Sequence, residues 1–543
     1  MRKCSRIWWL AILLCSLSST VLWAEMSDVL EVDDAVVQGD PASLEYLLYQ
    51  LATASLRDRR ELAEQVVLSG DERAGLVLQA LLDGRLLFDG QGVWLQDEDG
   101  QMIHAHDGVV AQPDGARVIP INNPLRNVLR DLIAKSDLSH HQPQRRAEAA
   151  QRMMRGLVSE QQLALLQQRL MVEEHPRVIE MLETALAVAA LQDVDPAQRI
   201  AALDALRGSL ISVVRARIAS IANDDPDLAV RQHAVDTLQS IEGRIALYRF
   251  SENLFFGLSL GSVLLLAALG LAITFGVMGV INMAHGELIM IGAYTTWLLQ
   301  ILLPQQLTLA LLLAIPAAFV VAGLVGVAME RGIIRFLYGR PLETLLATFG
   351  ISLILQQAVR SLFSPLNQAV QSPDWISGSL AISPVLSLTW NRIYVLLFAL
   401  LVFAVLLLIL KRTTLGLKVR AVSQNRAMAR ALGVRANWVD ASTFGLGAGI
   451  AGVAGVALAQ LSNVGPNMGQ AYIIDSFMVV VFGGVGNIWG TFVGAFGLGV
   501  MNKFLEPYAG AVLAKIVVLL FIILFIQYRP RGLFPQKGRS AES

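Results

Sequence analysis

Three polar side chains, Asn282, His285 and Glu287, interrupt a long apolar stretch of the chain. An apolar run over 254–278 precedes them, and another over 288–303 follows them. A polar group at membrane depth costs free energy and usually faces a bundle interior or a water-filled path. The segment therefore predicts a polar seam along which a solute crosses a membrane.

These side chains differ in the chemistry that they can perform. Asn282 offers both a donor and an acceptor to a neutral solute. His285 can titrate near neutral pH, but a structural, hydrogen-bonded role is the favoured interpretation. Glu287 could relay protons or coordinate a cation together with Asp475, whereas its place at a predicted helix start favours a carboxylate that satisfies backbone N–H groups. Gly286 lets the backbone approach a ligand or a neighbouring helix.

A similar pattern recurs further along the chain, where Asn467 and Gly469 precede a segment with Tyr472 and Asp475. Paired, glycine-interrupted segments in the two halves of a transporter point to its substrate path. Helix N-termini after Gly286 and Gly469 would present free N–H groups to a polar ligand. Chance similarity is the alternative explanation. The predicted solute path comprises Asn282, His285, Gly286, Glu287, Asn467, Gly469 and Asp475.

The composition divides the chain into two physical parts. Its 543 residues are 54% hydrophobic and 16% charged, which is too apolar for a single soluble domain. Residues 251–543 carry 9 acidic and 18 basic residues, whereas residues 1–250 carry 35 acidic and 25 basic ones. No basic block in the sequence indicates a nucleic-acid partner. His104 and His106 have metal-like spacing without further ligands, and no phosphate-binding loop is present, so we expect no metal, no cofactor and no enzyme activity.

The first 24 residues resemble a secretory signal. A basic start and an apolar core precede a cleavage position after Ala24, with a first membrane anchor as the alternative. Cys4 and Cys15 both lie in this segment, so a cleaved product would contain no disulfide. We therefore predict a signal peptide over 1–24 and a periplasmic domain over 25–246.

Helix signals dominate the predicted periplasmic domain. Pro176, Pro196 and Pro226 each follow an acidic residue closely and precede an apolar-periodic segment, which is a helix-start pattern. The last of these segments resembles a HEAT-type repeat helix, and an ordinary helical bundle is the alternative. Short apolar runs separated by Asp-Gly pairs over 84–120 predict a small β insertion.

Residues 250–535 form the predicted membrane domain. We expect eight full spans and one half-helix, at 473–485, which is too short to cross a bilayer. The full spans are predicted at 254–278, 284–303, 307–330, 344–363, 391–410, 441–462, 489–505 and 511–528. The predicted fold class is an all-α polytopic membrane protein with a mainly helical soluble N-terminal domain.

Basic residues predict the orientation in the membrane. They gather at 331–340, at 411–435 and after residue 528, and the positive-inside rule places these segments in the cytoplasm. Counting spans back from them places the N-terminal domain outside, as the signal also does. Within the cytoplasmic loop over 411–440, residues 417–432 can form an amphipathic helix at the membrane face, with a plain basic loop as the alternative.

Three ordered motifs resemble the branched-chain amino-acid permease family, the membrane subunits of ABC importers. Residues 276–287 resemble its first signature, residues 414–433 its cytoplasmic coupling loop, and residues 483–490 its third motif. The resemblance covers about residues 254–535. Members of the family usually lack a large N-terminal domain, and a secreted helical extension of this size looks like the urea-transporter branch.

The resemblance implies a permease subunit in a bacterial inner membrane that passes urea or a similar small polar solute into the cytoplasm. Its partners would be a second, dissimilar permease subunit, two cytoplasmic ATP-binding subunits and a periplasmic solute-binding protein. The coupling-loop residues that the resemblance implies are Gly416, Leu417, Arg420, Ala421, Asn425 and Gly433.

Three alternatives stay open from the sequence. A permease of the same family could carry branched-chain amino acids or short amides. A secondary transporter could be driven by ions through Glu287 and Asp475. The N-terminal domain could also be the functional part, as a sensor or adhesion module that the membrane half merely anchors.

Overall fold

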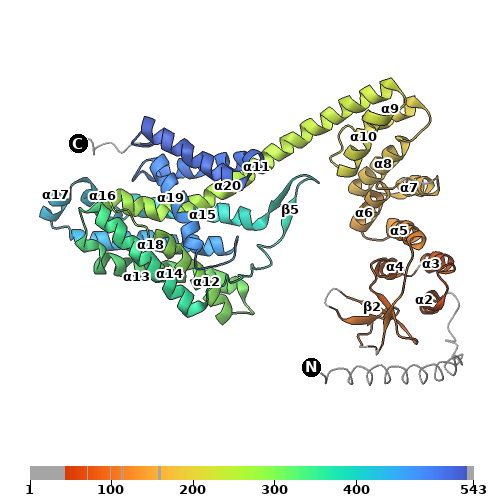
Figure 1. The fold of residues 1–543 in the computed structure, drawn as a ribbon, viewed down its shortest axis with the longest axis horizontal. Coiled ribbons are helices and arrows are strands. Elements are labelled where there is room, and N and C mark those ends of the chain that lie inside the picture. The colour runs from red at the N-terminus through yellow and green to blue at the C-terminus, as the bar shows by residue number, and fades with distance from the viewer. Residues whose placement is uncertain are drawn as a thin grey trace, which may run out of the picture. The chain divides into compact units, whose positions relative to one another are not determined.

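The computed structural model describes residues 43–534, except residues 70, 72, 98–99, 112, 114 and 157–159. The predicted signal segment and both cysteines lie outside the described residues. The chain forms two compact units, Met1–Leu238 (unit 1) and Gln239–Ser543 (unit 2) (Figure 1). Both units are built mainly from helices, which confirms the predicted fold class.

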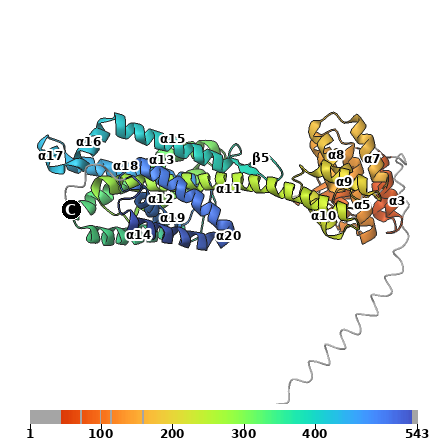
Figure 2. The ribbon, with the colours of Figure 1, turned by 90° about the horizontal axis from the view of Figure 1, so that it is seen from above.

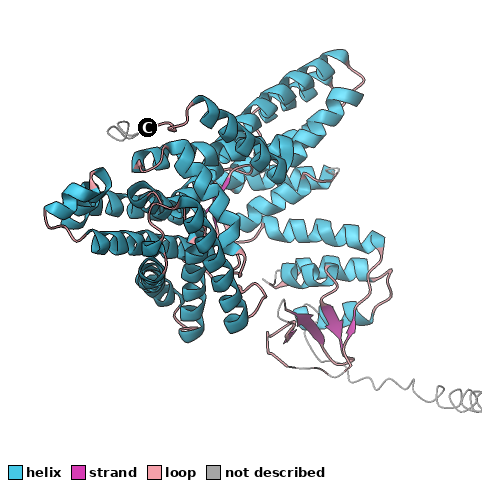
Figure 3. Cartoon of the chain, turned by 60° about the vertical axis from the view of Figure 1, so that its left-hand side comes forward, coloured by secondary structure: helices cyan, strands magenta, loops and turns pink. Residues whose placement is uncertain are grey.

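Unit 1 begins with three short helices and a small sheet. These elements are α2 (Leu44–Thr53), α3 (Arg59–Leu68), α4 (Ala74–Leu82), β1 (Leu86–Phe88), β2 (Val93–Gln96), β3 (Met102–His104) and β4 (Arg117–Val118). The strands pair antiparallel in the order β3-β2-β1-β4, so the predicted β insertion is present. Figure 3 shows this small sheet in magenta. Leu48, Leu78 and Leu86 join the helices and the sheet in one buried core.

A row of longer helices completes unit 1. They are α5 (Asn123–Leu138), α6 (Pro143–Met153), α7 (Glu160–Val172), α8 (Pro176–Ala190), α9 (Pro196–Leu206), α10 (Ser212–Asp224) and α11 (Leu228–Met278), which continues into unit 2. Pro176 and Pro196 stand at the first helical position, where a proline costs no backbone hydrogen bond. The predicted helix starts at these two prolines are therefore confirmed.

One buried contact recurs in this row of helices. Nη1 of Arg146 donates to the carbonyls six and five residues before it, both at 2.8 Å, and Nη1 of Arg199 does the same at 2.9 and 3.0 Å. Arg146 also pairs with Glu173, just before α8, and Arg199 pairs with Asp225, just before α11. A repeated helix-to-loop contact of this kind supports the HEAT-type interpretation of this part of unit 1.

The Glu173 contact makes a stability prediction. The hydrogen bond from Arg146, reinforced by Arg169, lowers the pKa of the Glu173 carboxyl from its ordinary 4.5 to about 2. Because the folded state binds the proton less tightly, the contact stabilises unit 1 above pH 4.5, and this stabilisation is lost as the pH falls towards 2. Its size is about 3 kcal/mol.

Glu173→Gln in the full chain should therefore reduce hydrogen-exchange protection of α6 to α8 about hundredfold at pH 7. After correction for intrinsic exchange rates, the same peptides of the unmodified protein should be less protected at pH 3 than at pH 7. The protection of the variant should not fall further between pH 7 and pH 3 through this contact, because the variant lacks the carboxylate. Glu183→Gln, on the exposed side of α8, is the matched control. Equal protection in both variants at pH 7 would contradict the assigned role of Glu173.

Unit 2 holds the remaining elements. They are α12 (His285–Leu302), α13 (Leu307–Gly332), η1 (Ile334–Phe336), α14 (Pro341–Phe363), β5 (Ser379–Ala381), β6 (Ser387–Thr389), α15 (Trp390–Arg412), α16 (Thr414–Gln424), α17 (Arg426–Ala431), α18 (Ala436–Ala459), α19 (Met468–Gly483) and α20 (Ile488–Tyr528). Six of the described helices are long and apolar enough to cross a membrane, namely α11, α13, α14, α15, α18 and α20. The full span predicted at 284–303 falls outside this group, because α12 carries polar groups that include His285 and Glu287. Helix α19 has only 16 residues, as expected for the half-helix predicted at 473–485.

Helix α20 combines two predicted spans. A straight helix of its 41 residues would be roughly 60 Å long. Yet Nδ2 of Asn487, next to its start, donates to the carbonyl of Phe534, beyond its end, at 3.2 Å. The backbone leaves the helical conformation at Gly510, where φ is 77°. The two halves therefore run antiparallel, and they correspond to the predicted spans at 489–505 and 511–528.

Helix α18 lies inside the bundle of unit 2 (Figure 2). A Cβ atom at Gly447, Gly452 or Gly455 would lie 2.7, 2.4 or 2.1 Å from a carbonyl oxygen of α11, α13 or α12, respectively. Small residues let membrane helices approach to backbone contact, where van der Waals packing stabilises the bundle. These glycines hold three helices against α18.

Candidate functional site

The break between α11 and α12 places a helix start deep inside unit 2. Gly279 has a φ of 67°, which turns the chain back at the end of α11. Nε2 of His285, the first residue of α12, lies 2.9 Å from the carbonyl oxygen of Ala267. Ala267 lies eleven residues before the end of α11, which is roughly 16 Å along that helix. Helix α12 therefore begins beside the middle of the membrane-spanning part of α11.

Helix α19 also starts inside unit 2, and it enters from the other end. The preceding Val464 pairs with Gln368, in the loop that follows α14, through backbone hydrogen bonds of 2.7 and 2.9 Å. A Cβ atom on Gly286 would lie 2.4 Å from the carbonyl oxygen of Gly469, and one on Gly469 would lie 2.3 Å from that of Gly286. The two glycine-interrupted segments thus touch, backbone to backbone.

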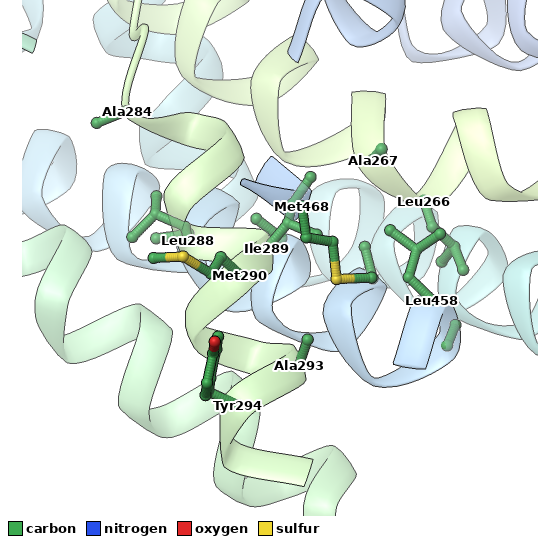
Figure 4. Close-up of a cluster of buried hydrophobic side chains, with 14 of the residues drawn as sticks. Leu266, Ala267, Ala284, Leu288, Ile289, Met290, Ala293, Tyr294, Leu458 and Met468 are labelled. Atoms are coloured by element: carbon green, nitrogen blue, oxygen red, sulfur yellow. The ribbon is translucent and has the colours of Figure 1, made fainter. Parts of the chain in front are cut away.

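Apolar side chains surround this contact. Leu266 of α11, Ile289 of α12, Leu458 of α18 and Met468 of α19 belong to one buried cluster (Figure 4). Such a low-dielectric environment makes each hydrogen bond within it stronger and each unpaired polar group more costly.

Helix α14 supplies the polar partners of this region from residues spaced four apart. Oγ1 of Thr348 accepts a hydrogen bond from the backbone N–H of Met283 at 3.1 Å. Oγ of Ser352 and Nε2 of Gln356 donate to Oε1 of Glu287 at 2.9 and 2.6 Å. One turn further on, Nη2 of Arg360 donates to Oδ1 of Asn467 at 2.6 Å. One face of α14 therefore contacts the α11–α12 break, Glu287 and the start of α19 in turn.

Several polar atoms near the contact are buried and make no hydrogen bond within the described part of the chain. They are Asn282 Nδ2, His285 Nδ1, Glu287 Oε2 and Tyr294 OH. Buried polar atoms are normally satisfied by protein, water or a ligand. This set offers donors and acceptors to a polar solute without bringing together a constellation for bond-breaking chemistry.

The structure separates one predicted residue from the others. Asp475 of α19 accepts from Nζ of Lys515 of α20 at 3.2 Å, so its carboxylate faces α20. Asn282, His285, Gly286, Glu287, Asn467 and Gly469 all lie at the two helix starts or against α14. Four residues beside the site were not among those predicted, although their four-residue spacing in an apolar segment indicates a polar helix face: Thr348, Ser352, Gln356 and Arg360.

The predicted coupling loop is helical, with α16 and α17 at one end of unit 2 (Figure 2). Oγ1 of Thr413 caps α16 by accepting from the N–H of Gly416 at 3.3 Å, and Oδ1 of Asn425 caps α17 at 2.9 Å. Gly416 packs against the carbonyl of Leu410, to which the Arg420 guanidinium also donates. The loop is therefore a fixed elbow on α15.

The outer side of this elbow carries exposed leucines and a groove. Gly433 ends α17 with a φ of 83°, and Ala421 packs against the small apolar cluster that joins α16, α17 and α18. Leu417 and Leu432 are exposed. A groove of about 640 Å³ is bordered by Thr414, Leu415, Lys418, Leu432, Gly433, Val434, Arg435, Trp438, Val439 and Ser442.

A polytopic bundle with two helix starts meeting at half depth, and with a helical elbow at one end, defines a membrane permease. Residues 253–526 match the family model described as branched-chain amino acid transport system / permease component. The chain belongs to this family and is a permease component of the ABC transporter type.

Curated relatives match up to about half of this chain. A high-affinity branched-chain amino acid transport system permease protein, BraD of Pseudomonas aeruginosa, is 31% identical over 53% of this chain and 96% of its own length. LivH of Salmonella typhimurium, which has the same description, is 30% identical over 52% of this chain and 95% of its own length. The ribose import permease protein RbsC of Escherichia coli is 30% identical over 23% of this chain and 42% of its own length. No solved structure matches the chain significantly.

The glycine contact yields a prediction about folding. Gly286→Ala would place a methyl group within 2.4 Å of the Gly469 carbonyl, so the helices must separate at a cost of about 1–3 kcal/mol. We expect a lower melting temperature of the detergent-purified protein. Gly350→Ala on α14 meets no atom within 4 Å and is the control. Equal melting temperatures for the two variants would show that the contact is not close.

Proposed function

We propose that this chain is the membrane subunit through which an ABC importer passes urea, or a similarly small uncharged solute, into the bacterial cytoplasm. The observation that carries the proposal is the meeting of two helix N-termini at Gly286 and Gly469, among buried side-chain atoms that have no hydrogen-bond partner within the described residues. The N–H groups of Met283, Ala284 and Glu287 already donate within the chain, so these side-chain atoms are the groups left to a polar solute. We place the solute path along this contact.

The chemistry of the path suits a neutral solute with several donors and acceptors. Asn282 Nδ2 is a free donor, whereas Glu287 Oε2 and Tyr294 OH can accept. Oε1 of Glu287 is already held by Ser352 and Gln356, which favours a positioned carboxylate over an ion relay. We therefore assign solute contact to Asn282 before Glu287.

A branched-chain amino acid is the second candidate solute. The names of BraD and LivH favour it, and the family model covers the whole of the proposed path. A carboxylate such as Glu287 could pair with an amino group, and a helix start could bind a carboxyl group. We prefer urea because the N-terminal extension resembles that of the urea-transporter branch, and because few charged groups lie at the contact between Gly286 and Gly469.

The partners follow from the family's mode of action, in which permeases work with ATP-binding subunits and a periplasmic binding protein. We propose one ATP-binding subunit on the groove beside α16 and α18 of this chain, and another on a second, dissimilar permease. The N-terminal unit would lie in the periplasm as a platform for the solute-binding protein, and the C-terminus would lie in the cytoplasm. Exposed Leu417 and Leu432 supply an apolar docking surface.

Uptake measurements in a strain deleted for the chain decide the solute. Cells complemented with the chain and its partners should accumulate labelled urea and should not accumulate labelled leucine. Leucine uptake without urea uptake would replace the first candidate by the second.

A second strain tests the role of the N-terminal domain. Uptake by cells complemented with a chain that lacks residues 30–240 would reject this domain as the main functional part.

A substitution at the elbow separates an ABC importer from an ion-driven transporter. Gly416→Ala would place a Cβ atom 2.1 Å from the Leu410 carbonyl and displace α16 from α15. ATP-dependent uptake should be abolished, because the docked ATPase would no longer act on the bundle. Gly332→Ala, at the end of α13, meets no atom within 4 Å and should leave uptake unchanged. Normal uptake by the Gly416 variant would favour the ion-driven alternative.

The Asn282 side chain can be tested without removing its turn. Oδ1 of Asn282 accepts from the N–H of Ala284 at 3.0 Å, and a serine hydroxyl can replace that acceptor. Asn282→Ser replaces the carboxamide, with its Nδ2 donor, by a shorter hydroxyl that cannot reach the same position, which should lower uptake at subsaturating solute up to about tenfold. Gln305→Ser is the matched control, because it also replaces a side-chain amide by a hydroxyl but lies in the exposed loop before α13. Wild-type uptake by the Asn282 variant would remove this residue from the path.

A further inference from the structure

Two carboxylates are buried at the end of unit 2 that carries α16 and α17. Glu330, near the end of α13, is 1% exposed, and Asp440, near the start of α18, is fully buried. Buried carboxylates are costly unless they are paired. Neither lies on the proposed solute path, so a different role must account for them.

A continuous chain of contacts links these carboxylates to α17. The Arg426 guanidinium, at the start of α17, donates to both oxygens of Asp440. Its Cζ atom also lies 4.8 Å from the ring centroid of Tyr338, in the loop before α14. The Tyr338 hydroxyl donates to Oε1 of Glu330 at 3.1 Å and also interacts with Asp440.

A second contact closes the same cluster from the side of the groove. Arg331 follows Glu330, and its Cζ atom lies 4.5 Å from the ring centroid of Trp438. Nε of Arg331 lies 4.0 Å from Oε2 of Glu330. Trp438 is largely exposed and borders the groove beside α16. The buried cluster therefore reaches the surface where we place the ATP-binding subunit.

The cluster also reaches both sides of the solute path. Asp440 belongs to α18, whose Gly452 and Gly455 are in backbone contact with α12. Tyr338 stands three residues before α14, the helix that holds Glu287. Close-packed interiors are stiff, so displacement of one packed element moves its neighbours. A shift of α17 would thus act on α12 through α18 and on α14 through Tyr338.

We propose that the cluster of Arg426, Asp440, Tyr338 and Glu330 is the link that transmits movement of the coupling helices to the helices that border the solute path. Stability alone does not explain it, because well-packed apolar residues often stabilise as well as a buried ion pair. A two-pronged guanidinium–carboxylate contact fixes orientation as well as distance. These are positioning residues, and they contact neither solute nor nucleotide. The proposal rests on the ABC importer function proposed above.

Tyr338→Phe tests the link with the smallest change, because it removes one hydroxyl and keeps the ring beside Arg426. The variant complex, with its ATP-binding subunits and solute-binding protein, is reconstituted in liposomes and supplied with labelled urea, or with leucine if urea is not transported. We expect ATP hydrolysis within twofold of wild type and at least a fivefold fall in solute transported per ATP hydrolysed. Asp440→Asn should act in the same direction, and Tyr508→Phe, which changes an exposed tyrosine of α20, should change neither quantity.

An unchanged ratio of solute to ATP in both variants would overturn the link. Loss of the ATP-binding subunits from both purified variants would also overturn it, because the cluster would then serve assembly alone. If only the Asp440 variant fails to assemble, the ratio of solute to ATP in the Tyr338 variant alone tests the link. Failure of the proposed function looks different, since the wild-type complex itself would then show no ATP-dependent uptake.

Discussion

The backbone contact between Gly286 and Gly469 is the constraint on which unit 2 depends. It holds the starts of α12 and α19 together in the interior, where each helix leaves N–H groups without a helical partner. Any side chain at either position would separate the helices. The position of this contact fixes how deep Asn282, His285 and Glu287 lie, and hence which polar groups a crossing solute would meet.

The two units solve the problem of buried polarity in different ways. Unit 1 buries charged side chains in pairs, such as Arg146 with Glu173, and repeats this contact along a row of helices. Unit 2 has one such pair at its coupling end, Arg426 with Asp440, but beside the proposed path it buries Glu287 against neutral donors of α14 and brings its helices together through glycines. The difference follows from the surroundings, because lipid provides no hydrophobic force between apolar helices and close backbone packing takes its place.

Two helices join the proposed path and the elbow, α18, which is buried along most of its length, and α14, which is mostly exposed. Helix α18 contacts the elbow through Asp440 and α12 through its glycines. Helix α14 begins three residues after Tyr338 and meets the residue before α19 at Arg360. Under the function proposed above, a rearrangement of the solute path would move the coupling end as well. This is the mechanical requirement of any transporter whose energy source lies outside the path.

The sequence by itself determined the features that depend on local pattern. Apolar runs located the spans, including both halves of α20, prolines marked two helix starts in unit 1, and the polar residues of 282–287 marked the break between α11 and α12. Only the tertiary structure decided which residues meet. Ser352 and Gln356 reach Glu287 from 65 and 69 positions away, and Asp475 turns to Lys515 instead of the path. Periodicity and composition report the environment of a segment, whereas partners this distant along the chain are chosen by helix packing.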